Sequence, residues 1–331
     1  MRSFTYSRAQ NVPSAVSEVT SQPQAKFIAG GTNLLDLMKI DVESPRHLVD
    51  ITRIALDSIK ANEEGGLRLG ALVTNADTAY HEQVEKRYPL LSHAILAGAT
   101  GQLRNMATDG GNLLQRTRCE YFYDTQTACN KREPGSGCSA IGGYTRNLAI
   151  LGTSEYCIAT HPSDMAVALT ALDARVNVTG QNGERSIPML EFHRLPGDTP
   201  HIDTNLQPDE IITSIDLPAK GFAKHYTYIK LRDRASYAFA LVSVAAALDV
   251  EGDTIREARI ALGGVAHKPW RKPEAEALLK DQPATRENFQ KVAEAYLEGA
   301  KGYGDNDFKI ELAKRAIVRA LQQALEMEGA S

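Results

Sequence analysis

The sequence predicts an α+β protein with more than one domain, and three observations support this prediction. The chain has 331 residues, more than a single hydrophobic core usually holds, so two or three domains are expected. Segments with strand patterning and segments with helix patterning are both frequent up to a boundary predicted near 218–221. Beyond that boundary, extended segments are followed by two strongly amphipathic helices at the C-terminus.

The composition is that of an ordinary globular protein. Hydrophobic residues make up 43% of the chain, charged residues 24%, and the formal net charge is -4, so nucleic acid is not an expected partner. The N-terminus lacks the apolar core of an export signal, and no stretch approaches the roughly 18 apolar residues of a membrane span. Direct membrane insertion is therefore not expected. The compartment stays open, because a folded subunit can be exported with a partner that carries the signal.

A strand, a glycine turn and a helix form the first predicted unit. The segment KFIAGGTNLLDLMK has an apolar strand pattern over 27–29, then two glycines, then a helix pattern whose cap is Thr32 or Asn33. The predicted inner face of this helix consists of Leu34, Leu35 and Met38. Next, HLVDI predicts a strand, and SIKANEEGGLRLGAL predicts two extended runs around a Gly-Gly turn.

The middle and C-terminal segments continue the mixed pattern. TNADTAYHEQVEKRYPLLSHAIL predicts helical structure opened by Thr74 or Asn75, and frequent glycines over 97–143 indicate tight loops. PSDMAVALTAL predicts a helix capped by Ser163, and Asn182-Gly183 predicts a hairpin turn before the strand PDEIITSIDLP. HYTYIKLRDRASYAFALVSVAAALDV is extended or mixed, whereas ENFQKVAEAYLEGA and FKIELAKRAIVRALQQALEME predict amphipathic helices.

Two glycine loops are candidates for binding a phosphate-bearing ligand. Backbone amides in AGGTN can hold a pyrophosphate, although this segment matches neither the dinucleotide nor the P-loop motif and also fits a plain tight turn. The loop ATGQLRNMATDGGNLL repeats the design with a threonine hydroxyl, two glycines and an asparagine amide. Two such loops suggest a long, flat ligand, and the alternative for the second loop is a simple bend.

The ordered motifs carry a specific resemblance. KFIAGGTNLLDLMK, GALVTNAD, ATGQLRNMATDGGNLL and THPSDMAVALTALDA, in this order and spacing, resemble the FAD-binding subunit of the xanthine dehydrogenase and aldehyde oxidoreductase family of molybdenum hydroxylases. The resemblance covers essentially the whole chain. It implies a two-part FAD-binding domain of the vanillyl-alcohol oxidase-like type, with subdomains over 1–60 and 61–220, and a smaller α+β C-terminal domain over 221–331.

The resemblance implies a set of flavin contacts. At the first loop, backbone amides, Thr32 and Asn33 would hold the pyrophosphate, and the contacts are Phe27, Ile28, Ala29, Gly30, Gly31, Thr32, Asn33 and Leu34. At the second loop, near the phosphates and the ribityl chain, they are Thr108, Asp109, Gly110, Gly111 and Asn112.

Three further residues match family positions around the ligand. Asp164 matches a residue on the adenosine side of FAD, although an acid in the first turn of a helix also explains it. Ile212 and Lys230 match positions near the adenine and the isoalloxazine ring, respectively. A cation near the pyrimidine end of the ring stabilises the anionic reduced flavin and raises its potential. No side chain here is expected to act as acid or base in an aldehyde oxidation.

All four cysteines lie in one stretch of the chain. Cys119, Cys129, Cys138 and Cys157 have the spacing C-x9-C-x8-C-x18-C, which is compatible with two disulfides, a zinc site or a 4Fe-4S cluster. The missing C-x-x-C counts against zinc. Lys131, Arg132 and nearby glycine amides suit a negatively charged cluster, but they also describe a solvated basic turn.

The cysteine-bearing insertion over about 115–157 narrows the resemblance. In QRTRC, CNKR and PGSGC it resembles the flavin subunits of bacterial periplasmic aldehyde oxidoreductase, and more loosely those of 4-hydroxybenzoyl-CoA reductase. This implies a 4Fe-4S cluster on the four cysteines and a heterotrimer. A large molybdopterin-containing subunit would oxidise an aldehyde to a carboxylic acid, and a small subunit with two 2Fe-2S clusters would deliver the electrons to the FAD of this chain.

The destination of the electrons and the compartment follow from the same resemblance. An external acceptor such as ferredoxin or quinone is expected, because no clear NAD site is visible in the sequence. Export to the periplasm with a signal-bearing small subunit is expected, with the cytoplasm as the alternative.

Other functions stay open at this point. The chain also fits a flavin subunit of a 4-hydroxybenzoyl-CoA reductase-like enzyme or of another molybdenum hydroxylase. Alternatives of other classes are a stand-alone flavin oxidase and a metal-binding scaffold without flavin. Whether a cluster would relay electrons or only stabilise the insertion is likewise open.

Overall fold

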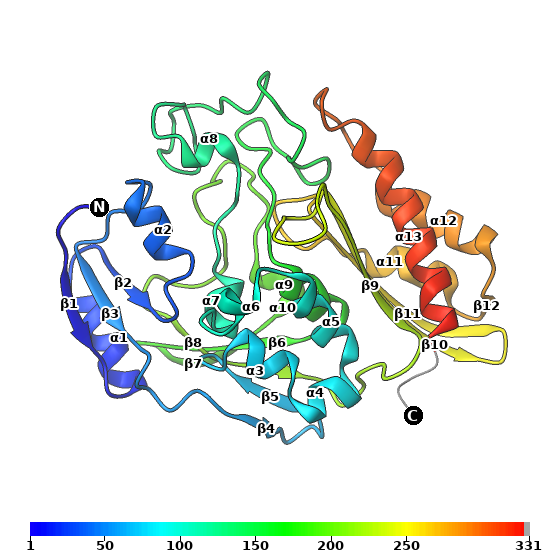
Figure 1. Cartoon of the computed structure of the whole chain (residues 1–331), viewed down its shortest axis with the longest axis horizontal. Helices are drawn as coiled ribbons and strands as arrows, with labels where there is room; N and C mark the ends of the chain where they lie inside the picture. The colour runs from blue at the N-terminus through cyan, green and yellow to red at the C-terminus, as the bar shows by residue number, and fades with distance from the viewer. Residues whose placement is uncertain (328–331) are drawn as a thin grey trace.

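Three sheets lie side by side in the computed structural model, which describes residues 1–327 (Figure 1). Helices cover the sheets, and the cysteine-bearing insertion projects between the N-terminal and C-terminal parts. The predicted α+β class is confirmed. Of the C-terminal domain predicted over 221–331, the last four residues, 328–331, lie outside the described part of the chain.

The N-terminal unit contains a small parallel sheet in the order β1-β3-β2. Its elements are β1 (Thr5–Arg8), α1 (Val12–Ser21), β2 (Ala25–Ile28), α2 (Leu34–Lys39) and β3 (His47–Asp50). The first glycine loop follows β2 directly, so it lies at the carboxyl edge of a parallel sheet, where ligands commonly bind. The predicted inner face of α2 was partly wrong, because this six-residue helix buries Leu37 and Met38 while Leu34 and Leu35 stay half-buried.

The central sheet is antiparallel, in the order β4-β5-β8-β6-β7. Its strands are β4 (Ile59–Ala61), β5 (Leu67–Gly70), β6 (Arg175–Gly180), β7 (Gly183–Pro188) and β8 (Ile211–Leu217). Gly180 pairs with Gly183, so the hairpin turn consists of Gln181 and Asn182. The predicted turn was therefore one residue too late, although Gly183 has the positive φ of +98° that favours glycine there.

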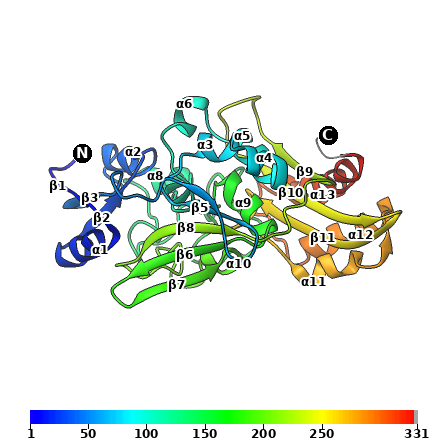
Figure 2. The same cartoon turned by 90° about the horizontal axis from the view of Figure 1, so that it is seen from below.

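Short helices lie on one side of this sheet (Figure 2). They are α3 (Asn75–Ala79), α4 (Glu82–Arg87), α5 (Pro89–Ala97), α6 (Gly101–Arg104), α7 (Asp109–Leu113), α9 (Asp164–Ala171) and α10 (Met189–Phe192). Ser163 caps α9 as predicted, because its Oγ accepts a hydrogen bond from the Ala166 N–H at 2.9 Å. Every residue of α9 after Asp164 is buried, so this helix fixes the position of Asp164 firmly.

The insertion contains little regular structure. Its only helix among the described residues is α8 (Glu120–Tyr123), and the remainder is turns and one isolated antiparallel bridge. The segment lies at the top of Figure 1, between the N-terminal unit and the C-terminal helices.

The C-terminal unit is an antiparallel sheet in the order β12-β11-β10-β9 with helices on one face. Its elements are β9 (Tyr226–Leu231), β10 (Val242–Glu251), β11 (Thr254–Gly263), α11 (Pro273–Glu276), the 3-10 helix η1 (Ala277–Leu279), β12 (Gln282–Pro283), α12 (Arg286–Leu297) and α13 (Phe308–Glu326). The opposite face packs against α5 and α9, so β9 brings Lys230 to the central helices. Within residues 1–327 no helix is both long and apolar enough to cross a membrane.

Candidate functional site

The two predicted glycine loops lie against each other. A Cβ atom added to Gly30 would lie only 1.8 Å from the carbonyl oxygen of Met106 in the second loop. Gly31 has a φ of +71°, and a Cβ atom on Gly110 would lie 3.1 Å from Ala71. Gly30 is therefore required for the close approach of the two loops, Gly31 for its left-handed backbone conformation, and Gly110 for the contact of the second loop with Ala71.

Unused hydrogen-bond donors gather at this contact. The N–H groups of residues 30–34 form no backbone hydrogen bond to the protein within the described residues. The Oδ1 atom of Asn33 accepts a hydrogen bond from the Arg116 N–H at 2.9 Å, and the buried Nδ2 of Asn33 has no partner in the described part of the chain. A buried donor without a partner is costly, so this arrangement fits an anionic group such as a pyrophosphate.

Two chambers extend from the glycine loops. The first chamber has a volume of about 470 Å³ and is lined by all of residues 27–34, together with Thr108, Gly110, Gly111 and Ile212. The second chamber has a volume of about 240 Å³ and contains Asn112, Asp164 and Lys230. Thr32, Asn33 and Gly111 line both chambers, so the free amides lie where the chambers meet. The sequence therefore identified residues that the fold brings together.

Asp109 has a different role from the one expected. Its side chain is completely buried and accepts hydrogen bonds from Asn75 Nδ2 at 2.7 Å and from Thr78 Oγ1 at 2.5 Å. Burial raises the pKa of Asp109 to about 7, although these hydrogen bonds act in the opposite direction. Asp109 lines neither chamber, because its backbone N–H is held by Val73 and turns the side chain into the core. The expected direct contact with the cofactor is thus corrected to a supporting role.

Asp164 and Lys230 lie together, whereas opposite ends of the ligand were expected for them. Lys230 Nζ lies 2.7 Å from Asp164 Oδ2, and the hydroxyl of Tyr228 donates to Asp164 Oδ1 at 2.6 Å. Ile212 lines the first chamber, whereas Asp164 and Lys230 line the second. Asp164 therefore does not share a chamber with Ile212, and the separate ends assigned to Asp164 and Lys230 are incompatible with their contact.

A chain of side-chain hydrogen bonds supports the second chamber. Asn112 Nδ2 donates to Asn75 Oδ1 at 2.6 Å, and Asn112 Oδ1 accepts from Ser163 Oγ at 2.5 Å. Asn75 in turn donates to Asp109. Sequence reasoning missed Asn75, whose only local signal is its place at the start of a helix after Thr74.

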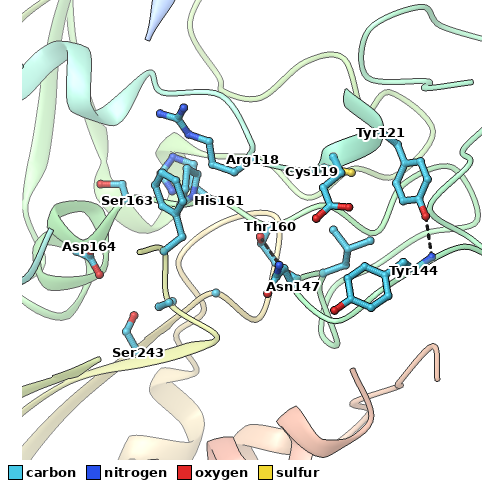
Figure 3. A pocket seen from close by; sticks show the side chains of 17 residues that line it. Arg118, Cys119, Tyr121, Tyr144, Asn147, Thr160, His161, Ser163, Asp164 and Ser243 are labelled. Atoms are coloured by element: carbon cyan, nitrogen blue, oxygen red, sulfur yellow. Dashed lines mark hydrogen bonds between the residues drawn. The ribbon is translucent and has the colours of Figure 1, made fainter. Parts of the chain in front are cut away.

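A third cavity, of about 90 Å³, lies beside the second chamber (Figure 3). It shares Arg118 and Asp164 with the second chamber. It also shares Cys119 with a small cavity that is lined by all four cysteines, the cysteine cavity. Figure 3 shows Arg118 and His161 at one end, with Tyr121 and Tyr144 at the other. Burial lowers the pKa of His161 well below its usual range, so its ring is neutral near pH 7.

The four cysteines converge on one small cavity in the insertion. Cys129 and Cys138 face each other across an isolated antiparallel bridge, flanked by the hydrogen bonds Asn130 N–H to Gly137 O and Ser139 N–H to Ala128 O. This is the non-hydrogen-bonded type of pair, in which the two side chains lie on the same face. A hairpin thus brings the two thiols together without a C-x-x-C motif.

The thiols are unpaired and largely buried. All four are free, and only Cys138 is partly exposed. Burial raises the pKa of the Cys119 thiol to about 12 and that of the Cys157 thiol to about 11. Within the described residues, no three His, Cys, Asp or Glu side chains are close enough to hold a single metal ion. Four free thiols around one cavity supply the number of sulfur ligands that a 4Fe-4S cluster takes.

The two cations near the cysteines behave differently from each other. Lys131 lines the cysteine cavity, and its Nζ pairs with Asp203 and donates to the Pro200 carbonyl oxygen at 2.8 Å. Arg132 instead donates to the carbonyl oxygens of Tyr121 at 2.7 Å and Phe122 at 2.9 Å, so it holds the backbone of the insertion. Asn130 was missed by sequence reasoning, and its Oδ1 accepts from the amides of Gly135 and Gly137 at 3.1 and 2.9 Å.

The two-chambered pocket with free amides at its centre defines a protein that binds an elongated, phosphate-bearing cofactor. Comparison with known proteins identifies the class. Residues 2–220 match the family model described as the FAD binding domain in molybdopterin dehydrogenase, and residues 225–324 match the CO dehydrogenase flavoprotein C-terminal domain.

Individual relatives agree with these family matches. The chain is 52% identical to the aldehyde oxidoreductase FAD-binding subunit PaoB of Escherichia coli, over 98% of this chain and 99% of that protein. It is 29% identical to the glyceraldehyde dehydrogenase medium chain of Sulfolobus acidocaldarius, over 82% and 79% of the two chains. A solved chain of carbon monoxide dehydrogenase from Hydrogenophaga pseudoflava has a TM-score of 0.77, 26% identity and 98% coverage of both chains. This protein belongs to the family of FAD-binding subunits of molybdenum hydroxylases and is an oxidoreductase subunit.

Proposed function

We propose that this chain is the FAD- and 4Fe-4S-carrying electron-transfer subunit of a heterotrimeric molybdenum aldehyde oxidoreductase. The observation that carries the aldehyde assignment is the full-length identity of 52% with an aldehyde oxidoreductase FAD-binding subunit. In this proposal the large subunit with molybdopterin oxidises the aldehyde to a carboxylic acid. The small subunit carries two 2Fe-2S clusters and passes the electrons to this chain, from which they leave to ferredoxin or quinone.

The pocket supports one orientation of FAD. The pyrophosphate would be held by the amides of residues 30–34 and by Asn33 Nδ2, because these donors have no partner among residues 1–327. The adenine would then occupy the first chamber with Ile212, and the isoalloxazine ring the second chamber with Lys230. When bound, FAD exchanges electrons singly or in pairs, which allows it to connect one-electron clusters with a two-electron acceptor.

Within the second chamber, Asp164 and Lys230 would orient the ring. Lys230 supplies the positive charge that favours reduced flavin, and Asp164 holds the ammonium group in place. Each carboxylate oxygen of Asp164 already accepts one hydrogen bond and retains a further lone pair for a donor on the ring.

The cysteine cavity supports the second cofactor. Four free thiols line one cavity, and the amides of Tyr121 and Phe122 face the Cys119 sulfur. Amide donors of this kind stabilise the negative charge that thiolate ligands bring to an iron-sulfur cluster.

A visible spectrum combined with iron and acid-labile sulfide assays tests both cofactors. We expect a flavin band and about four irons and four sulfides per chain, the content of one 4Fe-4S cluster. Purified protein that contains flavin but no iron would agree with the family assignment and would contradict the proposed 4Fe-4S cluster. Zinc in place of iron would have the same consequence. Aldehyde or alcohol oxidation by this chain alone would instead support a stand-alone flavin oxidase.

The compartment forms part of the same proposal. We expect export to the periplasm together with a small subunit that carries the signal. Cell fractionation of a strain with and without the signal of that subunit would test this, because the proposal requires that this chain stays in the cytoplasm when the signal is removed.

A further inference from the structure

Asp203 lies between the two candidate cofactor sites. Its carboxylate contacts Arg116 Nε at 2.5 Å and forms an ion pair with Lys131 Nζ. From the C-terminal unit, His267 Nε2 approaches Asp203 Oδ1 to 3.9 Å. Asp203 itself belongs to the loop after α10. Segments far apart in the sequence therefore meet at one side chain.

Arg116 connects Asp203 to the flavin pocket. Its guanidinium also pairs with Glu43, and both Arg116 and Glu43 line the first chamber. The backbone N–H of Arg116 holds Asn33 Oδ1, and this hydrogen bond directs the free Nδ2 of Asn33. A shift of Arg116 would therefore change how the donors of the flavin pocket are presented.

Lys131 connects Asp203 to the cysteine cavity. Its side chain is only 1% exposed, and Nζ also donates to the Pro200 carbonyl oxygen at 2.8 Å. Lys131 lines the cysteine cavity and lies two residues after Cys129 in the hairpin that brings Cys129 and Cys138 together. The position of this hairpin and the position of Asp203 are thus linked.

The carboxylate of Asp203 remains charged under ordinary conditions. Burial alone would raise its pKa, but the charges of Lys131 and Arg116 outweigh burial and hold the pKa of Asp203 well below its usual range. Loss of the Asp203 charge leaves the buried Lys131 without a carboxylate partner and Arg116 with Glu43 alone, so the three side chains depend on one another.

We propose that the ion-pair chain Arg116–Asp203–Lys131 couples the two cofactor sites, with Asp203 as the positioning residue. The inference rests on the proposed cluster. Filling the cysteine cavity fixes the hairpin and Lys131, and through Asp203 it fixes Arg116 and the Asn33 donor. FAD then binds to a pocket that is already ordered, and by reciprocity bound FAD slows the loss of iron.

The test compares FAD affinity with and without iron in the full chain, together with any subunits that copurify. FAD is removed reversibly, and quenching of flavin fluorescence gives its Kd in the iron-containing and the chelator-treated protein. In the unchanged protein we expect removal of iron to raise the Kd by about 5- to 10-fold. In Asp203→Asn the two values should agree within about 2-fold, and Asp203→Glu should restore most of the difference.

Two comparisons make the outcome decisive. Asp216 pairs with Arg68 and lines neither chamber, so Asp216→Asn should keep the full iron dependence of the Kd. Arg116→Gln breaks the chain from its other end and replaces Asp203→Asn if that variant does not fold. The coupling is overturned if the Kd for FAD of the unchanged protein does not depend on iron. It is also overturned if the Kd for FAD of Asp203→Asn depends on iron as strongly as that of the unchanged protein. Absence of iron from the unchanged protein overturns the proposed cluster instead.

Discussion

Lys230 Nζ lies 2.7 Å from Asp164 Oδ2, and the side chains are only 4% and 9% exposed, respectively. The pair joins β9 of the C-terminal unit to the first residue of α9 in the central unit. Removal of one partner from a buried pair leaves an uncompensated charge, which costs more than the pair itself contributes.

Lys230→Met should therefore lower the free energy of unfolding by about 3–5 kcal/mol. The double variant Lys230→Met with Asp164→Asn should recover part of that loss, because it removes both charges. Urea denaturation of the FAD-free protein measures both effects. In protein that retains flavin, Lys230→Met should also lower the flavin potential, whereas Lys230→Arg should keep it near its original value. Equal stability of the single and double variants would contradict the structural role of the pair.

Asn33→Asp tests the free donor at the glycine loops. The aspartate keeps an acceptor for the Arg116 N–H but replaces Nδ2, the unpartnered donor, by a negatively charged oxygen. We expect the Kd for FAD to rise by about 10- to 100-fold, the range for a lost hydrogen bond to a charged group. Stability without FAD should change little, and a fluorescence titration with a thermal melt separates the two effects. Unchanged affinity would show that no phosphate lies at this donor.

Gly30→Ala tests the contact between the two glycine loops. The new Cβ atom would lie 1.8 Å from Met106 O, so the loops must separate, and we expect loss of bound FAD together with a lower melting temperature. Gly101→Ala is the matched control, because a Cβ atom added at Gly101 would have no atom of the described chain within 4 Å beyond its immediate neighbours. The control should retain FAD and stability, as judged from the flavin absorbance of purified protein and from its thermal melt.

Asp109 should make the stability of the protein depend on pH. Its pKa is about 7 in the folded protein, against an ordinary value of 3.8, so the folded state retains a proton that the unfolded state releases. The resulting stabilisation is complete below about pH 4 and is lost as the pH rises towards 7, by up to about 1.4 kcal/mol per pH unit. In urea denaturation, the free energy of unfolding of the unchanged protein should therefore fall relative to that of Asp109→Asn as the pH rises from 5 to 7. A difference independent of pH would show that the carboxyl group is ionised throughout this range.

Cys129→Ser should remove iron and leave FAD bound when the flavin is present in excess. The serine hydroxyl replaces one of four sulfur ligands, and the cysteine cavity is separate from both flavin chambers. Iron analysis and flavin absorbance of the same sample measure both contents. Loss of both cofactors at saturating FAD would mean that the cluster organises the whole flavin site.

Much of the local structure was predictable because its signals are local. The cap at Ser163, the boundaries of β3 and β8 and the two C-terminal amphipathic helices follow from short patterns in the sequence. The hairpin turn was displaced by one residue, because Asn182-Gly183 is a strong turn signal wherever the pair falls relative to the strand register.

The candidate site was predictable in its parts but not in its arrangement. Both glycine loops and all four cysteines were identified, and the fold brings each set together. The direction of the Asp109 side chain was not predictable, because it depends on the hydrogen bond from its backbone N–H to Val73, a residue of a different segment. Asp203 carries no local signal, since its role consists entirely of contacts with distant side chains.

The sequence by itself therefore determined which local features this protein has: two glycine loops, a helix that begins with Asp164, and a stretch of chain with four cysteines. Only the tertiary structure decided which of them are neighbours. It placed Asp164 beside Lys230, which is 66 residues away, and turned Asp109 into the core. The physical reason is that caps and turns depend on a few adjacent residues, whereas charge pairing and burial depend on how complete sheets and helices pack.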